Sequence, residues 1–327
     1  MQWTEIRTTF TFVSVAKIFN LLGSCHSGEQ YTDQVALGPK LVIKDQSVGV
    51  ANQADQMNGL GGILGESLSF YAHISLVLLP SGIGPVDLTT GTTMPDSAGG
   101  VPTVTDQLLK QGLISTECIG IYYEPTTTAN AANGCLSFGG PDSSKYTGEH
   151  NYVPITKSSP ASNYWGIDQS ISYGGQEIMA SCGGIADTGT TLVMLPTSVL
   201  NAYKEATGAV EDPSTQLLTV TEDQYSNMQS MMFKIGVPPA IAHHDAIQNE
   251  YELTKNAQIW PRSMNDSLGV PSNKFCLIFA DMGNVNVGDG LCFINGFTFL
   301  QRFYSVYDVS NSQVGFATTQ YTQATTN

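Results

Sequence analysis

Five residues just past the middle of the chain, Asp187-Thr188-Gly189-Thr190-Thr191, constrain its fold more than any other segment. They separate two apolar stretches, Gly184–Ala186 and Leu192–Leu195. Apolar runs of this length, separated by glycine and hydroxyl residues, predict two buried strands joined by a tight turn. An aspartate that follows a buried strand can stay charged because the N–H groups and hydroxyls of the turn stabilise its carboxylate. The alternative is an Asx turn that only ends a strand.

Several other segments accompany this turn in a fixed order along the chain. They are Tyr31–Val35, Leu136–Gly140, Asp142–Gly148, Tyr152–Ile155, Tyr164–Ile167, Asn256–Arg262, Phe299–Asp308 and Val314–Ala317. With the Asp187 turn, they resemble the pepsin-like aspartic endopeptidases, and most closely the secreted polyporopepsin-type enzymes of fungi. Each lobe of a family member presents an apolar-apolar-Asp-Thr/Ser-Gly-Thr/Ser loop, and Ile185–Thr190 resembles the second of these loops. Several motifs in family order are far more specific than one Asp-Thr-Gly.

The resemblance implies an all-β, bilobal fold of the pepsin-like type. We expect a partial first lobe over residues 25–157, with an insertion at 66–82, and an essentially complete second lobe over residues 158–327, with an insertion at about 237–246. Short runs of Thr, Ser, Gly and β-branched residues agree with a β protein. Signals for helices are few and short, such as Pro196–Ala206.

The resemblance also implies a reaction. In this family two aspartates share a proton, and one activates water while the other donates to the scissile carbonyl oxygen, which requires that their pKa values differ. Asp187 is the candidate for one of them. Thr188 would bond to the opposite loop, Thr190 would orient the carboxylate, and Gly189 with Thr190 would offer backbone groups to an extended peptide.

Further roles carry over by position. Tyr164, Ile185 and Thr191 would contact substrate, although core packing is the alternative for Tyr164 and Ile185. The segment Phe293–Gly296 should pack behind the Asp187 loop and hold it rigid. The expected partner is a peptide or protein substrate, the expected state is a monomer, and the expected location is extracellular.

A second aspartate in this setting is missing from the 327 residues. Asp-Thr-Gly and Asp-Ser-Gly together occur once, at Asp187. In family members the first motif and a flap Tyr-Gly precede the segment that resembles Tyr31–Gly38, and counting back places the flap tyrosine at Leu21. We therefore expect residues 1–24 to be unrelated to the family and the chain to be an incomplete copy of an acid endopeptidase.

Three interpretations of these opening residues stay open: a signal peptide, a short helix or irregular start, and a misassigned gene start, which we favour. Residues 66–82 are either a surface insertion or a retained intron, and we favour the intron because apolar residues suit an exposed loop poorly. The alternative functions are a non-catalytic pepsin-fold peptide-binding protein, an inactive remnant, and a dimer in which two second lobes pair their aspartates.

Composition and motifs argue against other functions. The net charge of −15, from 13 Lys and Arg against 28 Asp and Glu, disfavours nucleic-acid and anionic-membrane partners. The apolar run Ile74–Leu79 is too short to span a bilayer. His243-His244-Asp245 lacks metal-ligand spacing, and no phosphate loop or nucleophile elbow occurs. We expect neither a metal nor a cofactor.

The chain contains 6 cysteines, which fits an oxidising compartment. Cys276 and Cys292 flank a hairpin-like turn region at Asp281–Gly290, and Cys276 lies near a position where pepsins place a disulfide cysteine. They form the candidate bridge, and two buried thiols are the alternative. Asn265-Asp266-Ser267 is a glycosylation sequon.

Overall fold

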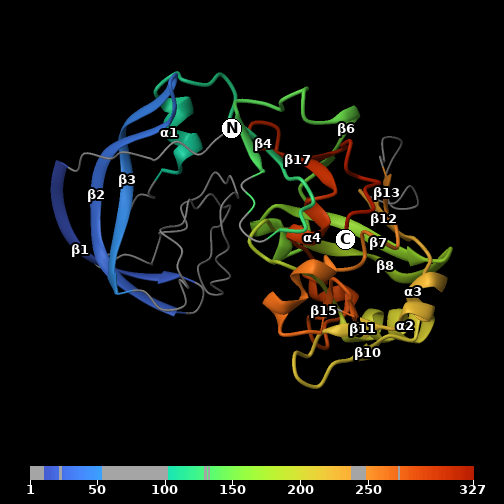
Figure 1. The fold of residues 1–327 in the computed structure, drawn as a ribbon. Helices are drawn as coiled ribbons and strands as arrows, with labels where there is room; N and C mark the ends of the chain where they lie inside the picture. Colours follow the sequence, from blue (N-terminus) through green and yellow to red (C-terminus); the bar gives the residue numbers. More distant parts are fainter. Residues whose placement is uncertain are drawn as a thin grey trace.

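The computed structural model describes residues 11–21, 24–53, 102–128, 131, 133–236, 248–271 and 273–327. The predicted insertions at 66–82 and about 237–246 lie outside these residues. Within the described ranges the chain is mostly β and forms four sheets, in agreement with the predicted fold class (Figure 1).

The first sheet contains the strands nearest the N-terminus. They are β1 (Thr11–Leu21), β2 (Ser24–Gly38) and β3 (Leu41–Gln53), in the antiparallel order β1-β2-β3. The helix α1 (Val104–Lys110) lies beside this sheet, where Ile43, Val104 and Leu108 form a small core. The alternative of a short helix or irregular start is wrong for residues 11–21, because this segment forms a strand that pairs with β2 at Thr11 and from Val15 to Leu21.

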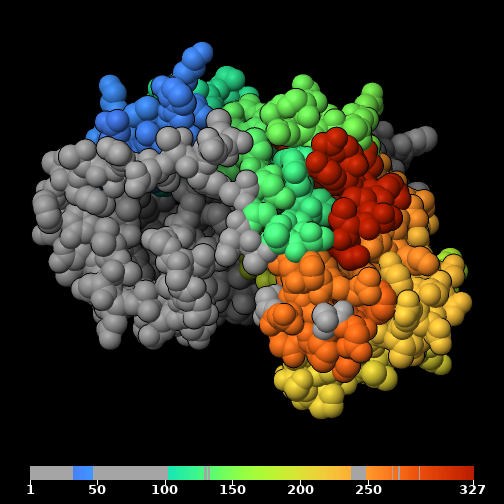
Figure 2. Space-filling view, in the orientation of Figure 1, coloured from blue at the N-terminus to red at the C-terminus, as the bar shows by residue number. Residues whose placement is uncertain are grey.

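A second sheet joins the middle of the chain to its C-terminal end. Its order is β5-β4-β17-β18-β6, and all its pairs are antiparallel. The strands are β4 (Cys118–Tyr122), β5 (Cys135–Phe138), β6 (Thr147–Pro154), β17 (Phe303–Asp308) and β18 (Gln313–Thr318). In the space-filling view the red C-terminal residues lie beside the green segment that carries β4 to β6 (Figure 2). Every residue of β17 is buried, so this strand is at the centre of the structure.

The third and largest sheet has the order β13-β12-β7-β8-β16-β9-β15. Its strands are β7 (Gly166–Tyr173), β8 (Gln176–Ala186), β9 (Val193–Leu195), β12 (Met231–Ile235), β13 (Asn249–Leu253), β15 (Phe279–Asp281) and β16 (Ile294–Asn295). The β7–β8 hairpin turns at Gly174 and Gly175, which both have positive φ and therefore favour glycine. The main hydrophobic core of the described residues packs on this sheet and continues to β17 and β18.

Short helices surround the large sheet. They are α2 (Thr197–Thr207), α3 (Glu222–Asn227), α4 (Phe297–Leu300), and the 3₁₀ turns Ala161–Asn163, Arg262–Leu268 and Val287–Asp289. The helix α2 confirms the helix predicted from Pro196. It ends at Gly208, which has a φ of 71° and caps the helix in the left-handed conformation.

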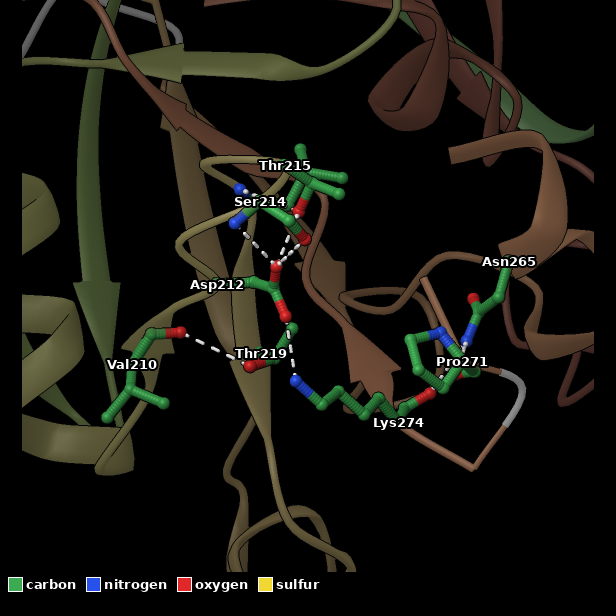
Figure 3. Close-up of polar contacts among 9 residues, drawn as sticks. Val210, Asp212, Ser214, Thr215, Thr219, Asn265, Pro271 and Lys274 are labelled. Atoms are coloured by element: carbon green, nitrogen blue, oxygen red, sulfur yellow. Dashed lines mark hydrogen bonds and ion pairs between the residues drawn. The ribbon is translucent and has the colours of Figure 1, made fainter. Parts of the chain in front are cut away.

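A fourth, small sheet is held by an ion pair. It contains β10 (Val210–Glu211), β11 (Leu218–Val220) and β14 (Phe275–Cys276). Just after β10, Asp212 accepts hydrogen bonds from the Ser214 backbone and hydroxyl, and it pairs with Lys274 Nζ at 2.7 Å (Figure 3). These contacts tie the β10–β11 turn to the residues that enter β14.

The sequon asparagine lies inside the same region. Asn265 is 0% exposed, and its Nδ2 donates to the carbonyl groups of Pro271 at 3.0 Å and Lys274 at 2.9 Å (Figure 3). The amide nitrogen that a glycan would need is therefore used inside the fold.

The structure does not form the candidate disulfide between Cys276 and Cys292. Both are buried thiols that are not bonded to each other, because β14 pairs with β11 whereas Cys292 lies beside β8, where its N–H donates to the Gly183 carbonyl at 2.8 Å. The Cys292 thiol is instead hydrogen-bonded to that of Cys182, which raises the pKa of Cys182.

Candidate active site

The site is built at the end of β8, where the buried strand opens into a turn. The strand ends at Ala186, and Asp187 follows at once, with part of its surface exposed. Gly189 N–H donates to Asp187 Oδ1 at 3.0 Å, and the Thr190 hydroxyl donates to Oδ2 at 2.7 Å. Both carboxylate oxygens are thus held by the turn that the sequence predicts.

Two opposing effects set the protonation of this carboxyl. Burial raises the pKa of Asp187 above its usual range, while the hydrogen bonds from Thr190 and Gly189 lower it. The net direction is upward. Among the described residues no cationic side chain forms an ion pair with Asp187. The group therefore binds its proton more readily than an ordinary aspartate.

A backbone cradle supports the Asp187 turn from the segment that begins at Asn295. The Asp187 N–H donates to the Asn295 carbonyl at 3.0 Å, and the Phe297 N–H donates to the Thr190 carbonyl at 2.6 Å. Gly296 fits between them because a Cβ there would lie 2.4 Å from the Thr190 carbonyl oxygen. The prediction that Phe293–Gly296 packs behind the turn is confirmed.

Tyr164 and Ile185 are brought together beside the turn. Ile185 is 6% exposed and packs with Ala161 and Ile294, and the partly buried Tyr164 lies against the same cluster. Packing thus accounts for most of the Ile185 surface. Thr191 is exposed. Thr188 lies within the turn, next to Asp187 and partly exposed.

The turn lies where the large sheet meets the central strand β17. The Ala186 N–H donates to the Trp165 carbonyl at 3.0 Å, and the Trp165 ring lies 5.3 Å from the ring of Tyr307 on β17. Burial raises the pKa of Tyr307, and the Asp187 charge adds to this effect. Asp187 is thus close to the sheet that joins the middle of the chain to its C-terminal end.

A buried pair of amides, Gln169 and Asn295, also belongs to this site and was missed in the sequence. Asn295 follows the apolar run Cys292–Ile294, but Gln169 lies between Asp168 and Ser170, so the sequence does not mark the two as partners.

Neither a metal site nor a membrane-crossing helix is found in the described part of the chain. No group of three or more His, Cys, Asp or Glu side chains is placed to hold a metal ion there. None of the helices described is long and apolar enough to cross a bilayer. His243 and His244 lie outside the described ranges.

Comparisons with known proteins place these features in a family context. A sequence model described as eukaryotic aspartyl protease matches residues 22–319. Polyporopepsin from Irpex lacteus is 45% identical over 324 residues, covering 98% of this chain and 86% of that protein. Rhizopuspepsin-1 from Rhizopus niveus is 35% identical over 65% of this chain and 48% of its own length.

A solved structure gives the same result for the fold. The crystal structure of aspartic proteinase from Irpex lacteus matches with a TM-score of 0.79 and 45% identity, covering 98% of this chain and 85% of that chain. The predicted resemblance and the predicted fold class are confirmed.

Proposed function

The chain belongs to the eukaryotic aspartyl protease family, and on that basis we propose that it is an aspartic endopeptidase, encoded here as an incomplete copy, in which Asp187 is one of two catalytic carboxylates. The observation that carries the proposal is the Asp187 carboxyl itself. It follows a buried strand, both its oxygens accept hydrogen bonds, and its pKa is raised. A perturbed carboxyl of this kind is suited to proton transfer.

In the proposed reaction Asp187 and a second carboxylate hold one proton between them. The ionised partner takes a proton from water, which attacks the scissile carbonyl carbon, and the protonated partner donates to the carbonyl oxygen. The raised pKa of Asp187 favours the protonated state more than in an ordinary aspartate. No step requires a cofactor.

We infer roles for the neighbouring residues by matching position. Backbone groups of Gly189 and Thr190 would bind an extended peptide, and Thr188 would bond to the opposite catalytic loop. Thr191, which is exposed, and Tyr164 would contact the substrate side chains, with Ile185 beneath them. The substrate is a peptide or protein, and we expect a secreted monomer that works in acid.

This chain supplies only one aspartate in the required setting. We therefore propose that residues 25–157 are a partial first lobe, that residues 158–327 are the complete lobe, and that residues 1–24 take the place of the segment that carries the second carboxylate. Full-length transcript sequencing tests whether the second carboxylate exists. An upstream Asp-Thr/Ser-Gly and Tyr-Gly, with codons 66–82 absent, would support the endopeptidase, and a transcript that begins at Met1 and keeps those codons would contradict it in favour of a protein without catalysis.

The single motif also supports a second candidate function, a pepsin-fold protein that binds peptides without cleaving them. The two functions separate in one experiment. The product of the full-length transcript and its Asp187→Asn variant are incubated with a fluorogenic peptide library between pH 3 and 6, and binding is measured on the same peptides. Cleavage that Asp187→Asn abolishes supports the endopeptidase. Binding without cleavage, equal in both proteins, supports the second candidate.

A further inference from the structure

Two side-chain amides lie in the core beside the strand that carries Asp187. Gln169 is on β7 and Asn295 is on β16, the two strands that flank β8. Both residues are 0% exposed. Asn295 Nδ2 donates to Gln169 Oε1 at 2.7 Å, and Gln169 Nε2 donates to Asn295 Oδ1 at 3.4 Å. The amides form a reciprocal pair that reaches across β8.

The surroundings of the pair are apolar. In strand register Gln169 lies between Cys182 on β8 and Ile235 on β12, and Asn295 lies next to Ala186. All three neighbours are buried. A buried amide is costly unless it is hydrogen-bonded, and each member of this pair satisfies the other. The pair therefore fixes the position of β7 relative to β16.

The backbone of Asn295 connects the amide pair to the Asp187 turn. Its carbonyl accepts the Asp187 N–H at 3.0 Å. Further along the same segment, the N–H groups of Phe297 and Thr298 donate to the carbonyl groups of Thr190 and Thr191 at 2.6 and 3.0 Å. The position of the Asp187 turn thus follows the position of residues 295–298.

We propose that Gln169 and Asn295 are positioning residues for Asp187, and that their paired amides fix the carbonyl group to which the Asp187 backbone is bonded. The inference rests on the proposed function, because it assigns the pair to the proposed catalytic carboxyl. Both residues act through the backbone, and the carboxylate stays within reach of Gly189 N–H and the Thr190 hydroxyl as a result.

The test is a ¹³C NMR titration of the Asp187 carboxyl in the full chain, with the resonance assigned by its loss in Asp187→Asn. Gln169→Met and Asn295→Leu each leave one amide without its partner. We expect each to raise the pKa of Asp187 by about half a unit or more, because the carboxylate loses part of its hydrogen bonding. If Gln169→Met or Asn295→Leu does not fold, Gln169→Asn takes its place. This variant keeps an amide on a shorter side chain, and we expect it to raise the pKa of Asp187 as well.

Gln258→Leu is the matched control. Gln258 is also 0% exposed, and its Nε2 donates to the carbonyl groups of Gln229 and Leu253 at 2.8 and 2.9 Å, neither of which belongs to the Asp187 turn or to residues 295–298. This variant should lower the melting temperature as much as the others and leave the Asp187 titration unchanged. The exchange variant Gln169→Asn with Asn295→Gln should return the pKa towards the wild-type value.

The outcomes separate this inference from the proposed function. An Asp187 titration that is the same in wild type, Gln169→Met and Asn295→Leu overturns the positioning role, as does an equal shift in Gln258→Leu. Absence of peptide cleavage by the wild type overturns only the proposed function, since the titration needs no substrate. Where cleavage occurs, we expect kcat to fall about tenfold in the single variants with KM unchanged.

Discussion

The Asp187 turn and the Asp212 turn share their local chemistry and differ in their tertiary partners. In each turn the aspartate accepts a hydrogen bond from the N–H two residues further on, in Gly189 or Ser214, and another from a nearby hydroxyl. At Asp212 the hydrogen-bonded Lys274 ammonium, followed by the Ser214 contacts, holds the pKa of the carboxyl well below its usual range. At Asp187 burial raises the pKa.

The difference teaches that the turn alone does not make a catalytic carboxyl. The turn provides the hydrogen bonds, and the surrounding fold decides whether the group is neutralised by a cation or left to bind a proton. The ion pair of Asp212 with Lys274 links the turn after β10 to the residues before β14. Asp187, without such a partner in the described residues, keeps a raised pKa, as its proposed catalytic role requires.

The largest expected effect separates the two aspartates by activity. In the product that also carries the upstream Asp-Thr/Ser-Gly, Asp187→Asn should lower kcat/KM for peptide hydrolysis by about 10³-fold or more, because the amide cannot exchange the proton that the reaction moves. Asp212→Asn should leave kcat/KM within about twofold when assayed at a temperature where the protein is folded. Equal losses in the two variants would show that the comparison between the turns is mistaken.

A smaller effect concerns the hydroxyl donors of the two turns. Thr190→Val removes the hydrogen bond to Asp187 Oδ2 and should raise the pKa of Asp187 further, with a loss of about tenfold in kcat/KM. Ser214→Ala removes the corresponding donor at Asp212 and should leave the kinetics unchanged. The measurement is a pH–rate profile for both variants, and an acidic limb that stays fixed in Thr190→Val would contradict the assigned role.

The pH dependence of stability should have opposite signs in the two turns. A carboxyl whose folded pKa is lowered stabilises the fold above its unfolded pKa of about 3.9, and this stability is lost as the pH falls. A raised pKa has the reverse effect, and stability is lost as the pH rises through and above about 4. Asp212→Asn should thus lower the melting temperature more at pH 6 than at pH 2, whereas Asp187→Asn should raise it at pH 6. Scanning calorimetry between pH 2 and 7 checks both, and curves of the same sign would refute the assignment.

The smallest effect is expected at Lys274, whose side chain is 41% exposed. Lys274→Met removes the ion pair and leaves the Ser214 contacts in place, so the melting temperature should fall by only about 1–3 °C at low salt. In 1 M salt the difference from wild type should shrink, because exposed charges are screened. A salt-independent loss would indicate that packing of the lysine stem, rather than its charge, stabilises the β10–β14 region.

The structural features that could be predicted from the sequence are those that short segments encode. The Asp187 turn, the helix from Pro196 and the supporting segment Phe293–Gly296 are all marked by contiguous residues with strong local preferences. The opening strand was missed because the local pattern of residues 11–21 fits several structures, and pairing with β2 decides among them.

Local sequence patterns did not predict the contacts between residues that are far apart in the chain. Gln169 and Asn295 are 126 positions apart, and polar residues in a strand usually face solvent, so nothing nearby marks them as partners. The candidate bridge between Cys276 and Cys292 assumed that a hairpin-like turn brings its flanks together. The chain instead pairs β14 with β11, which moves Cys276 into another sheet.

The buried amide of Asn265 has a practical consequence for producing this protein. A host that attaches glycans to nascent chains can modify the sequon before the surrounding fold closes, and a sugar on Nδ2 would then occupy the space of the Pro271 and Lys274 carbonyl contacts. Chains modified in this way should be retained as misfolded material, so the secreted fraction should carry an unmodified Asn265 by mass spectrometry. Yield in such a host should therefore depend on whether this loop folds around Asn265 faster than the glycan is transferred.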